Sequence, residues 1–223
     1  VDAASYKSGG IPPDSMASIF GSELSIRTAA AEALPLPYDL AGTSVYVNGQ
    51  PAPILYASPT QVNFVMPSNL DPGPATVIVA TAAGRYAVAT TSVSTSAPAI
   101  FTQNAQGTGD AAALFTTDGV NYQPGPLSLG TEVAATYLVL FGTGIRNAAA
   151  ANPLDENGVA ESVSVTSDGV NAQVTYAGPQ GFFAGLDQIN VLVPSGLQPG
   201  PRRAQVIVKV NGIEANRVTI QLK

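Results

Sequence analysis

One stretch of this sequence occurs twice in the chain, and it is the strongest indication of the fold. "YASPTQVNFVMPSNLDPGP" covers residues 56–74, and "YAGPQGFFAGLDQINVLVPSGLQPGP" covers residues 176–201. The two copies agree in the order and spacing of their Tyr, Gln, Asn, Pro and Gly residues. They differ mainly in one insert, "GFFAGLD", which adds residues 181–187 to the second copy.

The similarity extends upstream of these stretches. "VYVNGQPAPILYASP" (45–59) aligns with "VTSDGVNAQVTYAGP" (165–179), and "SIFGSEL" (18–24) aligns with "VLFGTGI" (139–145). Because order and spacing persist over both halves of the chain, we predict an internal duplication with about 95 residues in each unit.

Each unit has the pattern of a β-sheet protein. The alternating segments "TSVYVNG" and "ESVSVTSDG" end in Asn48-Gly49 and Asp168-Gly169, which favour tight hairpin turns. Ser167 stands where the pattern calls for an apolar residue, so the second hairpin is the weaker prediction. Helix is improbable outside residues 29–34. Alternation predicts that three residues of each later strand share one buried face: Val62, Phe64 and Met66 in the first unit, and Ile189, Val191 and Val193 in the second.

Composition excludes several classes of function. The 223 residues carry a net charge of −6, and they include no His, no Cys and no Trp. Without His and Cys there is no Ser-His-Asp or Cys-His device and no thiolate metal site. The few Lys and Arg residues form no basic cluster for nucleic acid, and no apolar run reaches the roughly 18 residues of a membrane span. We therefore expect no enzyme activity, no cofactor, no nucleic-acid partner and no membrane insertion.

The predicted architecture is all-β, with two tandem immunoglobulin-like β-sandwiches joined by a packed β-hairpin linker. We expect the first sandwich in residues 1–97, the linker in residues 98–124 and the second sandwich in residues 125–223. Within the linker, "AALFTTDGVNY" indicates two strands around a turn at Asp118-Gly119.

A family resemblance agrees with this architecture. "SIFGSEL", "VNGQPAPILYASPTQVNFVMP", "AIFT" (99–102) and "LDPGP" (70–74) resemble the uncharacterised C-terminal domain of many large secreted proteins of acidobacteria. Each unit is similar, more loosely, to the IPT/TIG type of immunoglobulin-like domain, with Gly21 and Gly142 after an early strand. The resemblance implies an extracellular module at the tail of a longer protein, and it transfers no activity, cofactor or catalytic residue.

The insert is the sharpest candidate for a binding site. Neighbouring residues of an extended segment alternate faces, so Phe182 and Phe183 cannot both enter one core. One hypothesis is a loop, with Asp187 at its end, that contacts a sugar or a protein. The alternative, which is favoured, is that Phe182 and Phe183 fill the interface with the central hairpin or with the first unit.

Two further groups are weaker candidates. Asn63 and Asn190 occupy equivalent strand positions, as do Gln61 and Gln188, and we expect these amides to satisfy neighbouring polar groups rather than a ligand. Residues 152–161 gather acids around Asp155 that have the chemistry of a calcium ligand set, although a solvated loop is the favoured interpretation.

The function that fits best is a non-catalytic extracellular interaction or structural module, such as a spacer or an adhesin-like C-terminal domain of a secreted protein. The alternative is a carbohydrate-binding module of a polysaccharide-processing protein. We expect a monomer, located outside the cell or on its surface, whose partner is a cell-surface protein or a polysaccharide.

Overall fold

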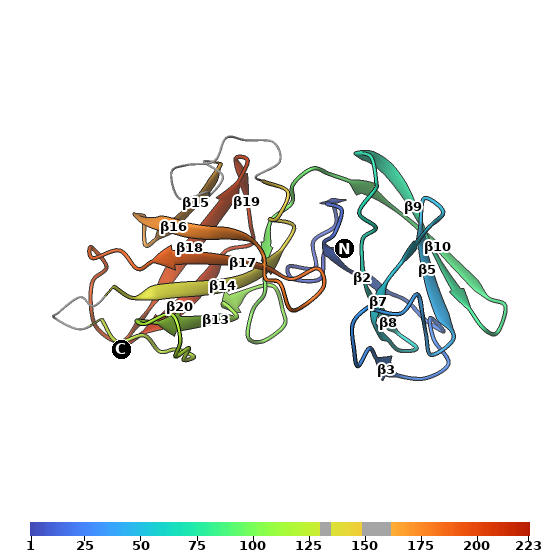
Figure 1. Ribbon diagram of the computed structural model, residues 1–223, viewed down its shortest axis with the longest axis horizontal. Coiled ribbons are helices and arrows are strands. Elements are labelled where there is room, and N and C mark those ends of the chain that lie inside the picture. The colour runs from blue at the N-terminus through green and yellow to red at the C-terminus, as the bar shows by residue number, and fades with distance from the viewer. Residues whose placement is uncertain (130–134, 149–161) are drawn as a thin grey trace. The chain divides into compact units, whose positions relative to one another are not determined.

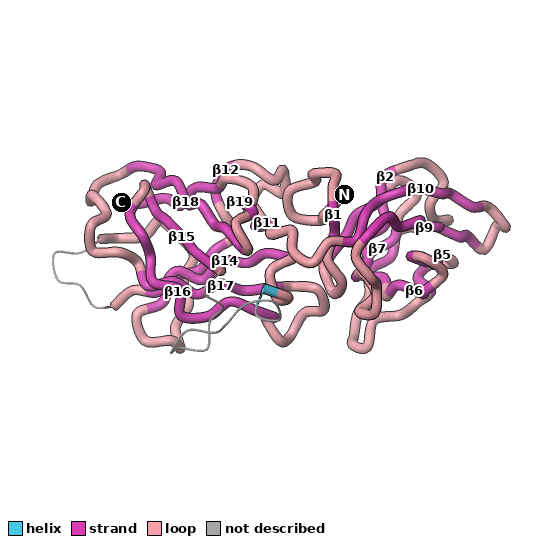
Figure 2. Tube along the Cα trace, turned by 90° about the horizontal axis from the view of Figure 1, so that it is seen from above, coloured by secondary structure: helices cyan, strands magenta, loops and turns pink. Residues whose placement is uncertain are grey.

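The structure is a computed structural model that describes residues 1–129, 135–148 and 162–223. The chain divides into two compact units. Unit 1 comprises Val1–Thr95 and Gly181–Gly185, and unit 2 comprises Ser96–Gln180 and Leu186–Lys223. Strands and loops account for nearly all of the described residues (Figure 2). The predicted all-β class, with immunoglobulin-like β-sandwich repeats, is confirmed.

Unit 1 has two sheets that enclose its core (Figure 1). One sheet has the order β1-β10-β9-β5-β4, with β6 paired to β5, and the other has the order β2-β8-β7-β3. The strands of the first sheet are β1 (Gly10–Ile11), β4 (Asp39–Leu40), β5 (Thr43–Val47), β6 (Gln50–Ala52), β9 (Gly73–Thr81) and β10 (Tyr86–Val93). Those of the second are β2 (Met16–Phe20), β3 (Ala29–Ala30), β7 (Ile54–Ala57) and β8 (Gln61–Val65).

Unit 2 repeats this plan with additional strands. Its strands follow the order β11-β14-β17-β16-β15-β18-β20-β12, with β13 paired to β14 and β19 paired to β18. Their bounds are β11 (Ala99–Ile100), β12 (Gly109–Asp110), β13 (Ala113–Thr116), β14 (Tyr137–Thr143), β15 (Val163–Ser167), β16 (Val170–Pro179), β17 (Asp187–Leu192), β18 (Arg202–Val210), β19 (Ile213–Glu214) and β20 (Val218–Leu222).

One strand belongs to both layers of unit 2. The first residues of β16 pair with β15, and the later ones pair with β17. In unit 1 the same segment is split into β6 and β7 at Pro53, whose missing N–H cannot take part in a continuous ladder. Both units nevertheless carry a register shift at the same place, between Ile54 and Tyr56 and between Val174 and Tyr176. The duplication is therefore visible in the backbone as well as in the sequence.

The faces predicted from alternation are confirmed. All six predicted core residues of β8, β17 and the positions just after them are buried, and both predicted hairpin turns form. Asn48 and Asp168 adopt positive φ angles of 50° and 46°, as this turn requires. Ser167 is buried in spite of its hydroxyl, so β15 keeps its register.

Residues 29–34, the one segment where the sequence left room for a helix, form none. Ala29 and Ala30 form β3, which pairs with β7, and no helix follows among these described residues. A run this short does not sustain a helix by propensity alone. Leu34 also precedes Pro35, and a residue before proline is driven away from helical angles.

The segment predicted as a linker lies in unit 2. Residues 98–124 supply β11, β12 and β13, and β13 pairs antiparallel with β14. Within β13, Phe115 exchanges both backbone hydrogen bonds with Gln123 around the Asp118-Gly119 turn. This segment therefore completes the sheets of unit 2.

Candidate functional site

The insert forms a closed loop with exposed rings. Its neck is closed by the backbone hydrogen bond from the Gln180 N–H to the Leu186 carbonyl, 2.9 Å long. Gly181 and Gly185 turn the chain with φ angles of 98° and 77°, which side-chain-bearing residues rarely adopt. Between them the side chains of Phe182 and Phe183 are exposed, with relative accessibilities of 79% and 65%. The loop therefore presents a surface of two adjacent phenyl rings to solvent.

Asp187 is not part of that exposed surface. Its side chain is fully buried at 0% accessibility, and its Oδ2 accepts the backbone N–H groups of Ile145 (2.7 Å) and Arg146 (3.1 Å). Its Oδ1 accepts Nε of Arg146 at 2.6 Å, and Nη2 of the same guanidinium donates to the Leu186 carbonyl. Burial raises the pKa of Asp187, although the Arg146 charge and the three N–H donors oppose that shift. The carboxylate therefore binds the turn at Ile145 and Arg146 and is not exposed at the surface.

Unit 1 shows what this carboxylate replaces. There the N–H of Leu24, the counterpart of Ile145, donates to the backbone carbonyl of Pro59 at 3.0 Å. In unit 2 the corresponding turn is bound by the side chain of Asp187, the last residue of the insert. The last residue of the insert, Asp187, therefore provides the acceptor for the turn at Ile145 and Arg146.

The paired amides have a structural role in both units. Nε2 of Gln61 donates to Oδ1 of Asn63 at 2.8 Å, and Nε2 of Gln188 donates to Oδ1 of Asn190 at the same distance. In unit 1 the Ser18 hydroxyl also donates to Asn63. These amides bond with one another, as the prediction that they satisfy neighbouring polar groups requires.

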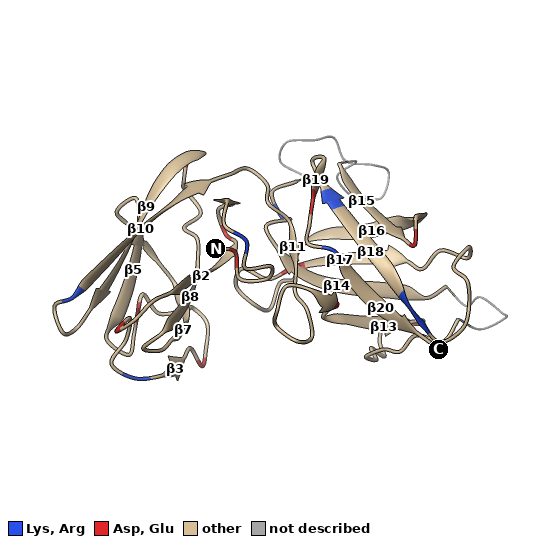
Figure 3. Cartoon of the chain, turned by 180° about the vertical axis from the view of Figure 1, so that it is seen from behind, with Lys and Arg blue, Asp and Glu red and all other residues tan. Residues whose placement is uncertain are grey.

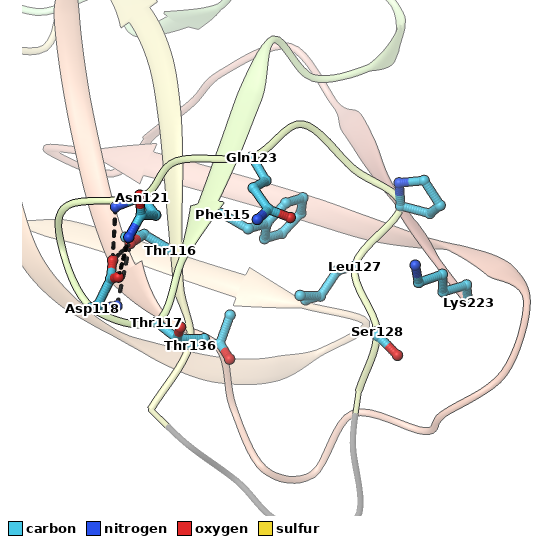
Figure 4. Close-up of a pocket in the computed structure, with 11 residues that line it drawn as sticks. Phe115, Thr116, Thr117, Asp118, Asn121, Gln123, Leu127, Ser128, Thr136 and Lys223 are labelled. Carbon is cyan, nitrogen blue, oxygen red and sulfur yellow. Dashed lines mark hydrogen bonds between the residues drawn. The ribbon is translucent and has the colours of Figure 1, made fainter.

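A pocket of about 440 Å³ lies in unit 2 beside the Asp118 turn (Figure 4). Phe115 and Leu127 supply its apolar wall, and the Asp118 turn forms its polar rim. That rim is bonded within itself: Oδ1 of Asp118 accepts the N–H groups of Val120 (2.9 Å) and Asn121 (2.8 Å), and Oδ2 accepts the Asn121 amide. These bonds, led by the Asn121 N–H, lower the pKa of Asp118. The polar groups of the rim therefore stabilise the turn to which they belong.

Asp110 is a second carboxylate that holds strands together. On β12 it accepts the Thr219 hydroxyl and the Gln221 amide, each at 2.6 Å, and it pairs with Arg203 at 3.0 Å. Burial alone raises the pKa of Asp110, but the side-chain hydrogen bonds from Arg203, Thr219 and Gln221 outweigh it and lower the pKa to about 2. Sequence reasoning missed this group because its partners lie far along the chain.

The Asp110 cluster predicts a pH dependence of stability. Its folded pKa of about 2 lies below the ordinary value of 3.8, so its contribution is fully present above about pH 4 and is lost as the pH falls through 2. With Arg203 exposed, we expect Asp110→Asn to lower the free energy of unfolding by about 1 kcal/mol at pH 7. Urea unfolding of both proteins from pH 7 to pH 2 should show this difference shrinking below pH 4. A difference that is constant over this range would contradict the prediction.

Two general properties concern only the described residues. Their His, Cys, Asp and Glu side chains form no group of three or more that could hold a metal ion, and the acids around Asp155, weighed as calcium ligands against a solvated loop, lie outside the described residues. Within the same part of the chain, none of the helical structure has the length and apolar character needed to cross a membrane.

Comparison with protein-family models and with curated protein sequences gives no match. Among solved structures, the chain is similar to SGBP-B of the Bacteroides ovatus mixed-linkage glucan utilization locus, in complex with a mixed-linkage heptasaccharide. The identity is 12%, the TM-score is 0.39, and the match covers all of this chain and 46% of that one.

Two other solved structures are similar at the same level. Domains 5–6 of the S-layer protein SbsC match at 11% identity and a TM-score of 0.27, over 100% of this chain and 96% of that one. The extracellular region of plexin A4 matches at 12% identity and a TM-score of 0.30, over 97% of this chain and 17% of that one. The chain thus spans less than half of SGBP-B and of the plexin A4 region, and likeness at this level assigns it no function.

Proposed function

We propose that this chain is a non-catalytic extracellular interaction module that contacts its partner through the loop Gly181–Gly185. The observation that carries the proposal is the exposure of Phe182 and Phe183 at the tip of a closed loop. Burial of one large apolar side chain contributes about 1.5–3 kcal/mol, so a partner that covers both rings gains substantial binding energy.

The acidic groups support a non-catalytic role. The chain has no His, which removes the usual general base near neutral pH. Asp110, Asp118, Asp168 and Asp187, whose pKa values depart from the ordinary one, each bind N–H or guanidinium groups of their own neighbours. These carboxylates therefore stabilise the fold through hydrogen bonds and ion pairs within the chain.

A polysaccharide is the narrower candidate for the partner. Phenyl rings offer flat apolar faces to the apolar faces of sugar rings, and this loop exposes two of them at consecutive positions. The module would then act as the binding part of a larger extracellular protein. A cell-surface protein is the broader alternative, since aromatic side chains are enriched at the centres of protein interfaces.

The test is affinity electrophoresis of the full chain through gels that contain soil or cell-wall polysaccharides. We expect retardation that the Phe182→Ala/Phe183→Ala variant loses. The matched control is Ile26→Ala/Tyr38→Ala, which removes two exposed apolar side chains elsewhere and should keep the retardation.

Thermal unfolding of the same proteins tests the loop directly. Because both rings are exposed, the loop variant should unfold with a free energy within about 0.5 kcal/mol of the parent. A variant that is clearly less stable, without retardation of the parent on any gel, would show that the rings pack within the molecule and would overturn the proposal.

A further inference from the structure

The outer edge of β10 in unit 1 is uncovered along most of its length. β1 pairs with it at Ser92 and Val93, and the Thr91 hydroxyl donates to the Gly9 carbonyl at 3.2 Å. No other strand of the described chain pairs with that side of residues 86–90. Residues 86–90 are exposed, and the whole strand Tyr86–Val93 carries no charged side chain (Figure 3). Proteins normally protect such an edge with charge, with proline or with another segment.

The equivalent edge in unit 2 is covered by the chain itself. β12 runs parallel to β20 and pairs Gly109 with Val218 and Asp110 with Thr219. The N–H of Ala111 then donates to the Thr219 carbonyl at 2.8 Å. An extended segment therefore occupies this position in one of the two copies.

The register of the sheets fixes which residues correspond. Val77 pairs with Val47, the last residue of β5. Val206 pairs with Ser167, the last residue of β15. On their other side Val77 and Val206 pair with Ala89 and Val218. Ala89 in unit 1 is therefore the counterpart of Val218, the residue opposite β12.

The counterparts differ in size and in burial. Val218 and Ile220 are buried in unit 2, whereas Ala89 is exposed and Thr91 is only partly buried in unit 1. The smaller residues border a pocket of about 450 Å³ within unit 1. Its wall includes the core side chains of Ile11, Phe64, Met66 and Val77, and Val1, Ser8 and Gly9 of the N-terminal segment also line it. A strand added here has room for a side chain larger than Ala111, the buried residue that follows β12.

The charge at this position differs too. In unit 2 the carboxylate of Asp110 is bound by Arg203, which pairs with Gln221. In unit 1 the residue opposite Ser92, the counterpart of Gln221, is Pro74. Without the guanidinium, a carboxylate on the added strand would lose its ion pair, so a neutral residue fits better.

We propose that the β10 edge of unit 1 binds an extended, uncharged peptide segment of a partner protein. The segment runs parallel to β10. It places a large apolar side chain in the pocket of unit 1, at the position equivalent to that of Ala111 after β12 in unit 2. A second copy of the chain fits less well, because its own β10 would offer only Ala87, Ala89 and Thr91 on the corresponding face. The inference rests on β10 and its pocket and not on the Phe182–Phe183 loop.

The test uses the full chain labelled with ¹⁵N and two synthetic peptides. One copies residues 107–114 of the chain, and the other carries the equivalents of Asp110→Thr and Ala111→Leu. We expect the second peptide to shift the amide signals of residues 86–91 and to slow their hydrogen exchange. We expect the parent peptide to bind at least about tenfold more weakly.

Two variants separate the pocket from the opposite face of the strand. Ala89→Lys places a charge beside the pocket and should abolish the effect, whereas Val88→Lys, on the other face of β10, should preserve it. Both residues are exposed, so both proteins should fold. Absence of a response to the second peptide at millimolar concentration, or shifts confined to another edge, would overturn the proposal. So would a dimer in sedimentation that Ala89→Lys dissociates, because a second copy would then be the occupant.

Discussion

Replacement of Asp187 by Ala should lower the free energy of unfolding of unit 2 by about 3–5 kcal/mol, as expected when one partner of a buried ion pair is removed. The change leaves the largely buried guanidinium of Arg146 without its carboxylate. It also leaves the N–H groups of Ile145 and Arg146 without their acceptor. Urea unfolding followed by the amide signals of unit 2 measures the loss, and the signals of unit 1 serve as an internal reference because two domains can unfold separately.

Two further variants identify the cause of this loss. Asp187→Asn keeps an oxygen acceptor of the same shape and should be less destabilising than Asp187→Ala. Adding Arg146→Ala to Asp187→Ala should recover part of the stability, because the uncompensated charge is then gone. If Asp187→Ala costs less than about 1 kcal/mol, the carboxylate does not hold the turn as described.

Replacement of Asn216 by Ala should cost unit 2 about 2–4 kcal/mol, since each buried polar group left unpaired costs about 1–3 kcal/mol. The buried Asn216 amide accepts the N–H of Ile100 at 2.7 Å and donates to the carbonyls of Ile100 and Gly107, each at 2.9 Å. It thereby satisfies the side of β11 that faces away from β14.

The readout for Asn216→Ala is amide hydrogen exchange at Ile100 together with urea unfolding. Exchange at Ile100 should accelerate strongly, because the segment around β11 loses its partner on one side. Asn104→Ala is the matched control: its amide oxygen accepts only the exposed Gln106 N–H, so the loss should stay below about 1 kcal/mol. Equal effects of the two changes would contradict the assigned role of Asn216.

The strands of the repeated stretch were predictable because their signals are local. Alternation places Val62, Phe64 and Met66 on one face within a single strand, and Asn48-Gly49 specifies its turn without reference to distant residues. Repetition of the pattern about 120 residues later strengthened each of these predictions.

The candidate site was predicted only in part, for the opposite reason. The sequence marks Phe182 and Phe183 as anomalous, but their exposure depends on how the loop closes. An acid beside such a loop resembles a surface ligand, whereas the partners of Asp187 lie 41 and 42 residues away. The bonds of Asn216 to Ile100 span 116 residues. Contacts of this range follow from the folded sheets, and residue spacing carries no trace of them.

The Asp187 turn also has a consequence for the evolution and engineering of this chain. Two interactions of the insert stabilise its own base: the Gln180–Leu186 hydrogen bond closes its neck, and its last residue, Asp187, binds the adjacent turn. Its tip can therefore diversify while the framework stays constant, as the hypervariable loops of antibodies do on their sandwich. Residues 182–184, which lie between the two turn glycines, are therefore the place to graft a foreign recognition sequence.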